Sequence, residues 1–151
     1  MKTIKTEQAL SAYRMLSNAK YNMMEDSDKI KIFKITRAIK PIATAFDEAG
    51  KEAAEKMKFD GFDEQLRNAQ LYEQAKKDNS EELPMTESDY KEFIKKLIEY
   101  NNLVKSTIKE LGDKEETIDV ELLNEDSLGK LMASNDWTME QVMAISDIVC
   151  E

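Results

Sequence analysis

The side chains that most often carry acid–base and nucleophilic chemistry are unevenly represented in this chain. Its 151 residues include 31 aspartates and glutamates, one cysteine and no histidine. Without histidine, the chain lacks the usual general base, the Ser–His and Cys–His pairs of covalent catalysis, and the commonest metal ligand. The single cysteine, Cys150, can form neither a zinc site nor an internal disulfide. We therefore expect a protein that is not an enzyme and uses no cofactor or metal.

The carboxylates and glycines do not mark a site either. Two carboxylates can act together as general acid and base, but close pairs arise by chance among 31 acidic residues. The acidic stretches 113–119 and 124–126 lack the order of acids around a central glycine that a calcium loop needs. The four glycines, Gly50, Gly61, Gly112 and Gly129, are too scattered for a phosphate-binding loop. No catalytic, cofactor-binding or metal-binding residue is predicted.

The strongest pattern in the chain lies between Ser27 and Met57. Apolar residues recur there in steps of three and four, which predicts one long helix with a continuous buried face. The apolar residues of this stripe are Ile32, Ile35, Ile39, Ile42, Phe46, Ala49, Ala53 and Met57.

The side of this helix opposite the stripe is both apolar and basic. Rotating by 100° per residue places Ile30 and Phe33 there, among Lys29, Arg37 and Lys40. Apolar anchors ringed by arginine and lysine are common at protein interfaces. We therefore expect Ile30, Phe33, Arg37 and Lys40 to contact a protein partner or a second copy of this chain. In the alternative, another segment of the same chain covers the two apolar residues, as happens inside helical bundles.

The remaining pattern predicts a mainly α fold, an irregular helical bundle built on two long helices, with a single domain over residues 1–151. We expect the other helices over residues 6–21, 63–75, 86–111 and 127–133 and after Thr138, where Thr138 and Gln141 have the spacing of a capping box. Alternation over Thr117–Leu122 predicts a short strand. We expect Thr3–Lys5 to pair with Ile118–Leu122 in a minimal two-stranded β element.

The short C-terminal helical pair within residues 128–148 has the spacing of a helix-turn-helix. Its second helix offers Glu140, Gln141 and Asp147 and no lysine or arginine, so the DNA phosphates would repel it. We expect the two helices to close the core instead, with Trp137 as a buried plug.

The charge is distributed unevenly along the chain. The net charge is −9, but residues 1–58 carry +4 and residues 59–151 carry −13. An acidic total argues against general nucleic-acid binding. This separation of charge along the chain could steer a partner or drive self-association. In the alternative, the basic residues 1–58 and the acidic residues 59–151 attract each other within one fold. No run approaches the roughly 20 apolar residues of a membrane span, and no apolar stretch follows Lys2 and Lys5 as in a signal peptide, so we expect a cytoplasmic protein.

The order of these features resembles the small helical accessory proteins of bacteriophages and prophages, including those encoded near tail genes. The likeness rests on the helix end at Ala19-Lys20, the basic-apolar helix at Lys29–Pro41, the acidic middle, Val120-Glu121-Leu122 and Asn135-Asp136-Trp137-Thr138. It implies a phage accessory protein made in the cytoplasm of a bacterial host, with no assigned catalytic residues. Two functions fit: an assembly or chaperone-like factor that binds another phage protein, or a counter-defence protein that occupies a host factor through its acidic surface or sequesters a small nucleotide signal.

Overall fold

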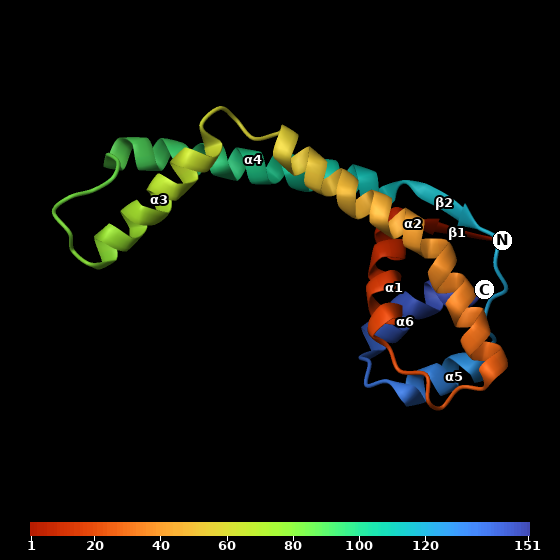
Figure 1. The fold of residues 1–151 in the computed structure, drawn as a ribbon. Helices are drawn as coiled ribbons and strands as arrows, with labels where there is room; N and C mark the ends of the chain where they lie inside the picture. The colour runs from red at the N-terminus through yellow and green to blue at the C-terminus, as the bar shows by residue number, and fades with distance from the viewer. The chain divides into compact units, whose positions relative to one another are not determined.

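The structure is a computed structural model that describes all residues from 1 to 151 (Figure 1). It contains six helices and one two-stranded antiparallel sheet. The elements are β1 (Lys2–Lys5), α1 (Thr6–Asn18), α2 (Asp26–Lys56), α3 (Phe62–Lys77), α4 (Glu87–Asp113), β2 (Glu115–Ile118), α5 (Glu125–Ser134) and α6 (Met139–Val149). The predicted mainly helical fold with a minimal β element is confirmed. None of the helices is long and apolar enough to cross a membrane.

The chain divides into two compact units. The first unit consists of residues 1–50 and 109–151, and the second unit consists of residues 51–108. The long helices α2 and α4 each contribute residues to both units. The single domain expected over residues 1–151 stays a prediction.

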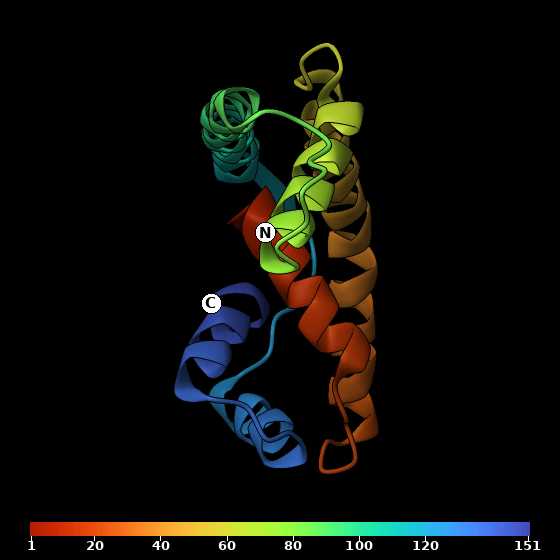
Figure 2. The ribbon, with the colours of Figure 1, turned by 90° about the vertical axis from the view of Figure 1, so that its left-hand side faces the viewer.

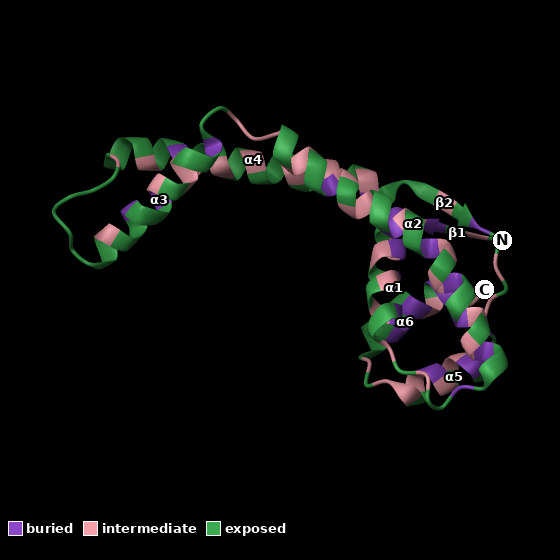
Figure 3. Cartoon of the chain, viewed as in Figure 1, coloured by how far each residue is buried: buried purple, intermediate pink, exposed green.

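The core of the first unit is aliphatic and forms around the predicted stripe of α2. Ile32, Ile35 and Ile39 are all buried, and α2 continues through Pro41 without a break. The surrounding elements supply the other buried residues, namely Ile4, Ala9, Ala12, Leu16, Met24, Ile118, Leu123, Leu131, Ile145, Ile148 and Val149. Buried positions therefore line one side of the first part of α2 (Figure 3). Figure 2 shows α1, α2, α5 and α6 around this core.

The sheet pairs the strand that precedes α1 with the strand that follows α4. The pairing is antiparallel, with Lys5 opposite Glu115 and Lys2 opposite Ile118. Ile4 and Ile118 are both buried. A minimal two-stranded element is confirmed, but the predicted partner residues are wrong, because Thr3–Lys5 pairs with residues 115–117 and not with Ile118–Leu122. The pairing still places Ile4 and Ile118 in one core.

The second strand differs from the prediction, because it begins at Glu115 and ends at Ile118 instead of covering Thr117–Leu122. Two contacts at the start of α1 set this register. The Thr6 hydroxyl donates to the Leu111 carbonyl at 2.6 Å, and the Thr6 amide donates to the Lys114 carbonyl at 2.9 Å. These two hydrogen bonds hold the end of β1 against the end of α4. The pairing of β1 with β2 therefore begins directly after α4 ends.

The helix starts were predicted in part. The Thr138 hydroxyl accepts a hydrogen bond from the Gln141 amide and the Gln141 side chain accepts one from the Thr138 amide, so the capping box is confirmed. The helix expected over residues 63–75 begins at a different residue. Helix α3 begins one residue earlier, after Gly61 in a left-handed conformation with φ of 78°, and Asp63 instead lies 3.1 Å from Lys58 Nζ.

Trp137 also differs from its prediction, because it is only partly buried. It precedes Thr138, the N-cap residue of α6, and packs against the edge of the aliphatic core rather than inside it. Leu131 and Ile145 fill the core interior at this end of the unit. The indole of Trp137 therefore covers the edge of the core and does not fill its interior.

The second unit has an aromatic core. Phe59 and Phe62 lie on either side of the turn at Gly61 with ring centroids 5.1 Å apart in an edge-on arrangement. Tyr100 of α4 packs on Phe62 at 4.6 Å, and its hydroxyl donates to the carbonyl of Ala54 at 2.5 Å. The aromatic side chains at this turn therefore join α3 to α4 and to the end of α2.

Candidate functional site

The four residues predicted to contact a partner all occupy exposed positions of α2. Ile30 is 55% exposed and Phe33 is 63% exposed, whereas Ile35 is 0% exposed. Arg37 and Lys40 are exposed beside them. No segment of the first unit covers these apolar side chains, so the alternative in which the chain's own packing hides them does not describe this unit.

A fifth residue belongs to the same surface. Lys34 is exposed, and a rotation of 100° per residue places it beside Ile30 and Arg37. The same rotation applied to the sequence could have identified it. We call Ile30, Phe33, Lys34, Arg37 and Lys40 the α2 surface.

The rotation of α2 about its axis is fixed from the opposite side. Asp28 is buried in the first turns of the helix, and its Oδ2 accepts a hydrogen bond of 2.7 Å from the hydroxyl of Ser127 in α5. Asp28 shares the buried side of the helix with Ile32 and Ile35. Because that side is held by a polar contact as well as by apolar packing, Phe33 must point away from the core.

The cations of the α2 surface have no ion-pair partner within the chain. Lys34, Arg37 and Lys40 form no ion pair, although Lys31 Nζ lies 3.5 Å from Oε1 of Glu121. Two exposed apolar side chains and three unpaired cations therefore share one helix face. This composition is suited to an acidic partner that also offers an apolar pocket.

A depression of about 460 Å³ borders one flank of the α2 surface. It is lined by Lys34, Arg37, Ala38, Asp119, Val120 and Glu121. The two carboxylates offset the two cations there. Phe33 and Lys40 lie on the other flank of the helix, so the cationic and apolar character of the α2 surface is strongest on that flank.

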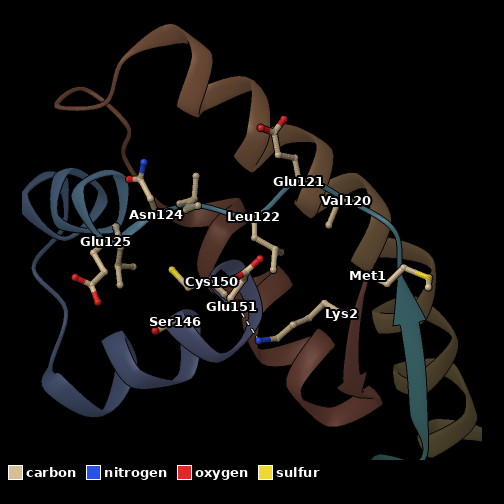
Figure 4. Close-up of a pocket in the computed structure, with 12 residues that line it drawn as sticks. Met1, Lys2, Val120, Glu121, Leu122, Asn124, Glu125, Ser146, Cys150 and Glu151 are labelled. Carbon is tan, nitrogen blue, oxygen red and sulfur yellow. Dashed lines mark hydrogen bonds between the residues drawn. The ribbon is translucent and has the colours of Figure 1, made fainter.

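A larger open depression of the first unit, of about 940 Å³, shares Val120 and Glu121 with the first one (Figure 4). Three chain segments line it, and its charged side chains are Lys2, Glu121, Glu125 and Glu151. The Lys2 ammonium donates to the carbonyl of Cys150 at 2.7 Å. A ligand in this depression would therefore meet three side-chain carboxylates and one ammonium group, that of Lys2, which already donates a hydrogen bond.

The only thiol of the chain lies in this depression and is not activated. Burial raises the pKa of Cys150 above its ordinary value, although a hydrogen bond with Ser146 and the charge of Lys2 act in the opposite direction. A nucleophilic cysteine needs a lowered pKa, because the thiolate is the reactive form. The structure also holds no group of three or more carboxylate or thiol side chains that could bind a metal ion. The α2 surface is thus the best-defined candidate site.

Comparison of the chain with protein-family models, with curated proteins and with solved structures gives no match in any of the three. The relationship to phage accessory proteins therefore stays a prediction from the sequence.

Proposed function

We propose that this chain is a non-enzymatic accessory protein that binds another protein through the α2 surface. The observation that carries the proposal is the exposure of Ile30 and Phe33, at 55% and 63%, among three cations without ion pairs. Covering an aliphatic or aromatic side chain of this size is favourable by about 1.5–3 kcal/mol. A partner that buries both side chains would therefore gain binding free energy from apolar surface that the chain itself leaves exposed.

The composition of the α2 surface supports a partner of particular chemistry. Phe33 lies on the flank of this surface away from Asp119 and Glu121, and a single aromatic anchor can contribute about 2 kcal/mol or more to binding. The basic side chains around it, Lys34, Arg37 and Lys40, favour carboxylates on the opposing surface and would speed association. We expect an acidic protein with an apolar pocket or an apolar helix face.

In the phage setting that the sequence resemblance implies, this partner would be another phage protein, and the chain would act as an assembly or chaperone-like factor in the cytoplasm of a bacterial host. The second candidate is counter-defence, in which the chain inhibits a host factor or sequesters a small nucleotide signal. The net charge of −13 over residues 59–151 favours this candidate, because an acidic surface can imitate nucleic acid.

The test compares two double variants in quantitative affinity capture from infected or lysogenic cells. Phe33→Asp with Arg37→Glu changes the α2 surface. Ile98→Asp with Lys95→Glu makes the same change in charge and apolar character on α4, where Ile98 is 55% exposed. The α2 variant should capture about tenfold less of the specific partner, and the α4 variant should capture as much as the unchanged chain.

Thermal melting of both variants accompanies the capture experiment. The proposal requires the α2 variant to keep its helical signal and its melting temperature, because the substituted side chains are exposed. Unfolding of this variant, or equal capture by all three chains, would overturn the assignment of the α2 surface. Capture of a virion protein would support the assembly role, and capture of a host factor would support counter-defence.

A further inference from the structure

Helix α6 carries a second exposed surface in the first unit. Met139 and Met143 are 68% and 63% exposed, and Glu140 and Asp147 are exposed beside them on the same side of the helix. We call these four residues the α6 surface. The opposite side of α6 packs into the aliphatic core through Val142, Ile145, Ile148 and Val149.

The α6 surface is the chemical complement of the α2 surface. Helix α6 contains two acidic residues and no lysine or arginine, whereas the exposed charges of the α2 surface are all positive. Both surfaces include two large exposed apolar side chains. Methionine side chains adapt their shape readily to an aromatic ring, so Met139 and Met143 are suited to receive Phe33.

We infer that a second copy of this chain docks its α6 surface on the α2 surface. This inference rests on the proposed function, because it names the occupant of the α2 surface. Figures 1 and 2 show α2 and α6 as separate elements of the same unit. Every copy therefore carries one surface of each kind.

The order of side chains along the two helices also matches. From the N-terminal end, the α2 surface is first apolar, at Ile30 and Phe33, and then basic, at Arg37. The α6 surface carries Met139, Glu140, Met143 and Asp147 in that order, so both methionines precede its last carboxylate. A parallel alignment of the two helices places apolar groups against apolar groups and Arg37 near Asp147.

The lengths of the two surfaces agree with this alignment. At a rise of 1.5 Å per residue, Ile30 to Arg37 spans about 10 Å and Met139 to Asp147 spans about 12 Å. Helix α6 has no basic residue in its last turn, so the negative end of its dipole is uncompensated by its own side chains. That end would lie near Arg37 and add to the attraction.

The inferred contact joins two different surfaces, so it is heterologous. Each copy in a pair leaves one α2 surface and one α6 surface unoccupied. Further copies can add in the same way, which produces a ring where the rotation closes and a longer assembly where it does not. The contact depends on opposite charges at exposed positions and should weaken as salt is added.

The test blocks one surface at a time. The α2-blocked chain carries Phe33→Asp and Arg37→Glu, and the α6-blocked chain carries Met143→Ser and Asp147→Ser, so that the two altered surfaces do not attract each other. Sedimentation equilibrium of the full chain is measured at low salt, for the unchanged protein, for each variant alone and for an equimolar mixture of the two variants. The Ile98→Asp, Lys95→Glu chain serves as the control.

We expect the unchanged and control chains to self-associate and each blocked chain alone to remain at the 17.4 kDa monomer mass. The mixture should form a 1:1 dimer that stops at twice that mass, because only one intact surface of each kind remains. Self-association of the α6-blocked chain alone would overturn the inference in favour of a contact between two α2 surfaces.

A monomeric unchanged chain, or a mixture that stays monomeric, would also overturn the inference. These outcomes leave the proposed function to its own test. If affinity capture still depends on the α2 surface, the occupant is a different protein and only the second copy is excluded. If capture is also independent of the α2 surface, both conclusions fail.

Discussion

The hydroxyl of Ser127 donates a hydrogen bond of 2.7 Å to Oδ2 of Asp28, and both residues are buried. The contact joins the start of α5 to the first turns of α2, on the side of α2 opposite Phe33. It therefore does more than satisfy a buried carboxylate. It holds the helix in the rotation that exposes the α2 surface.

Replacing Ser127 by alanine should destabilise the first unit. Oδ2 of Asp28 would lose its hydroxyl donor while remaining buried, although Oδ1 lies 3.9 Å from Lys31 Nζ, and an unsatisfied buried acceptor atom costs about 1–3 kcal/mol. Urea unfolding followed by circular dichroism measures this change in the free energy of unfolding. Ser106→Ala, at an exposed position of α4, is the matched control and should change it by less than about 0.5 kcal/mol. Equal stability of the two variants would show that the Ser127 contact contributes nothing.

Two glycines should respond to alanine in opposite directions. Gly61 has φ of 78° at the start of α3, a conformation that costs a residue with a Cβ atom about 1–2 kcal/mol. Gly129 lies inside α5, and a Cβ atom built there meets no atom within 4 Å. Gly61→Ala should lower the melting temperature, and Gly129→Ala should stabilise the protein by about 0.5–1 kcal/mol. Stabilisation by Gly61→Ala would contradict the left-handed turn.

The stability of the first unit should fall at alkaline pH. Burial raises the pKa of Tyr21 above 10.0, and its hydroxyl donates to the carbonyl of Leu16. The folded state therefore keeps this proton at pH values where the unfolded state loses it, so the stabilisation is present below pH 10 and is lost as the pH rises through the folded pKa. Urea unfolding between about pH 9 and about pH 11 should show a smaller loss for Tyr21→Phe than for the unchanged chain. An identical loss in both chains would assign the effect to other groups.

Periodicity along the sequence was sufficient for much of the fold. The spacing of Ile32, Ile35 and Ile39 identified the buried side of α2. The opposite side, on which Phe33 lies, could therefore be predicted to be exposed. Local spacing also identified the capping box at Thr138. These features depend only on residues within one or two helical turns of each other, so they can be predicted from one sequence.

Contacts between distant residues were harder to predict. Asp28 and Ser127 are 99 residues apart, and nothing near either one indicates the other. The start of β2 was placed two residues too late because Thr6, in another element, sets its register. The α6 surface was also missed, although the acidic character of residues 140–147 was visible, because the exposed side of a short apolar helix depends on what it packs against.

Site-specific photocrosslinking tests most directly whether the α2 surface is the contact surface. The full chain is produced in bacterial cells with a photoreactive phenylalanine analogue in place of Phe33 or, as the control, in place of Ile98; these side chains are 63% and 55% exposed. After irradiation, position 33 should yield a discrete protein adduct that Arg37→Glu reduces by about tenfold, and position 98 should yield none. Adducts of equal intensity at both positions, or no adduct at position 33, would contradict the assignment.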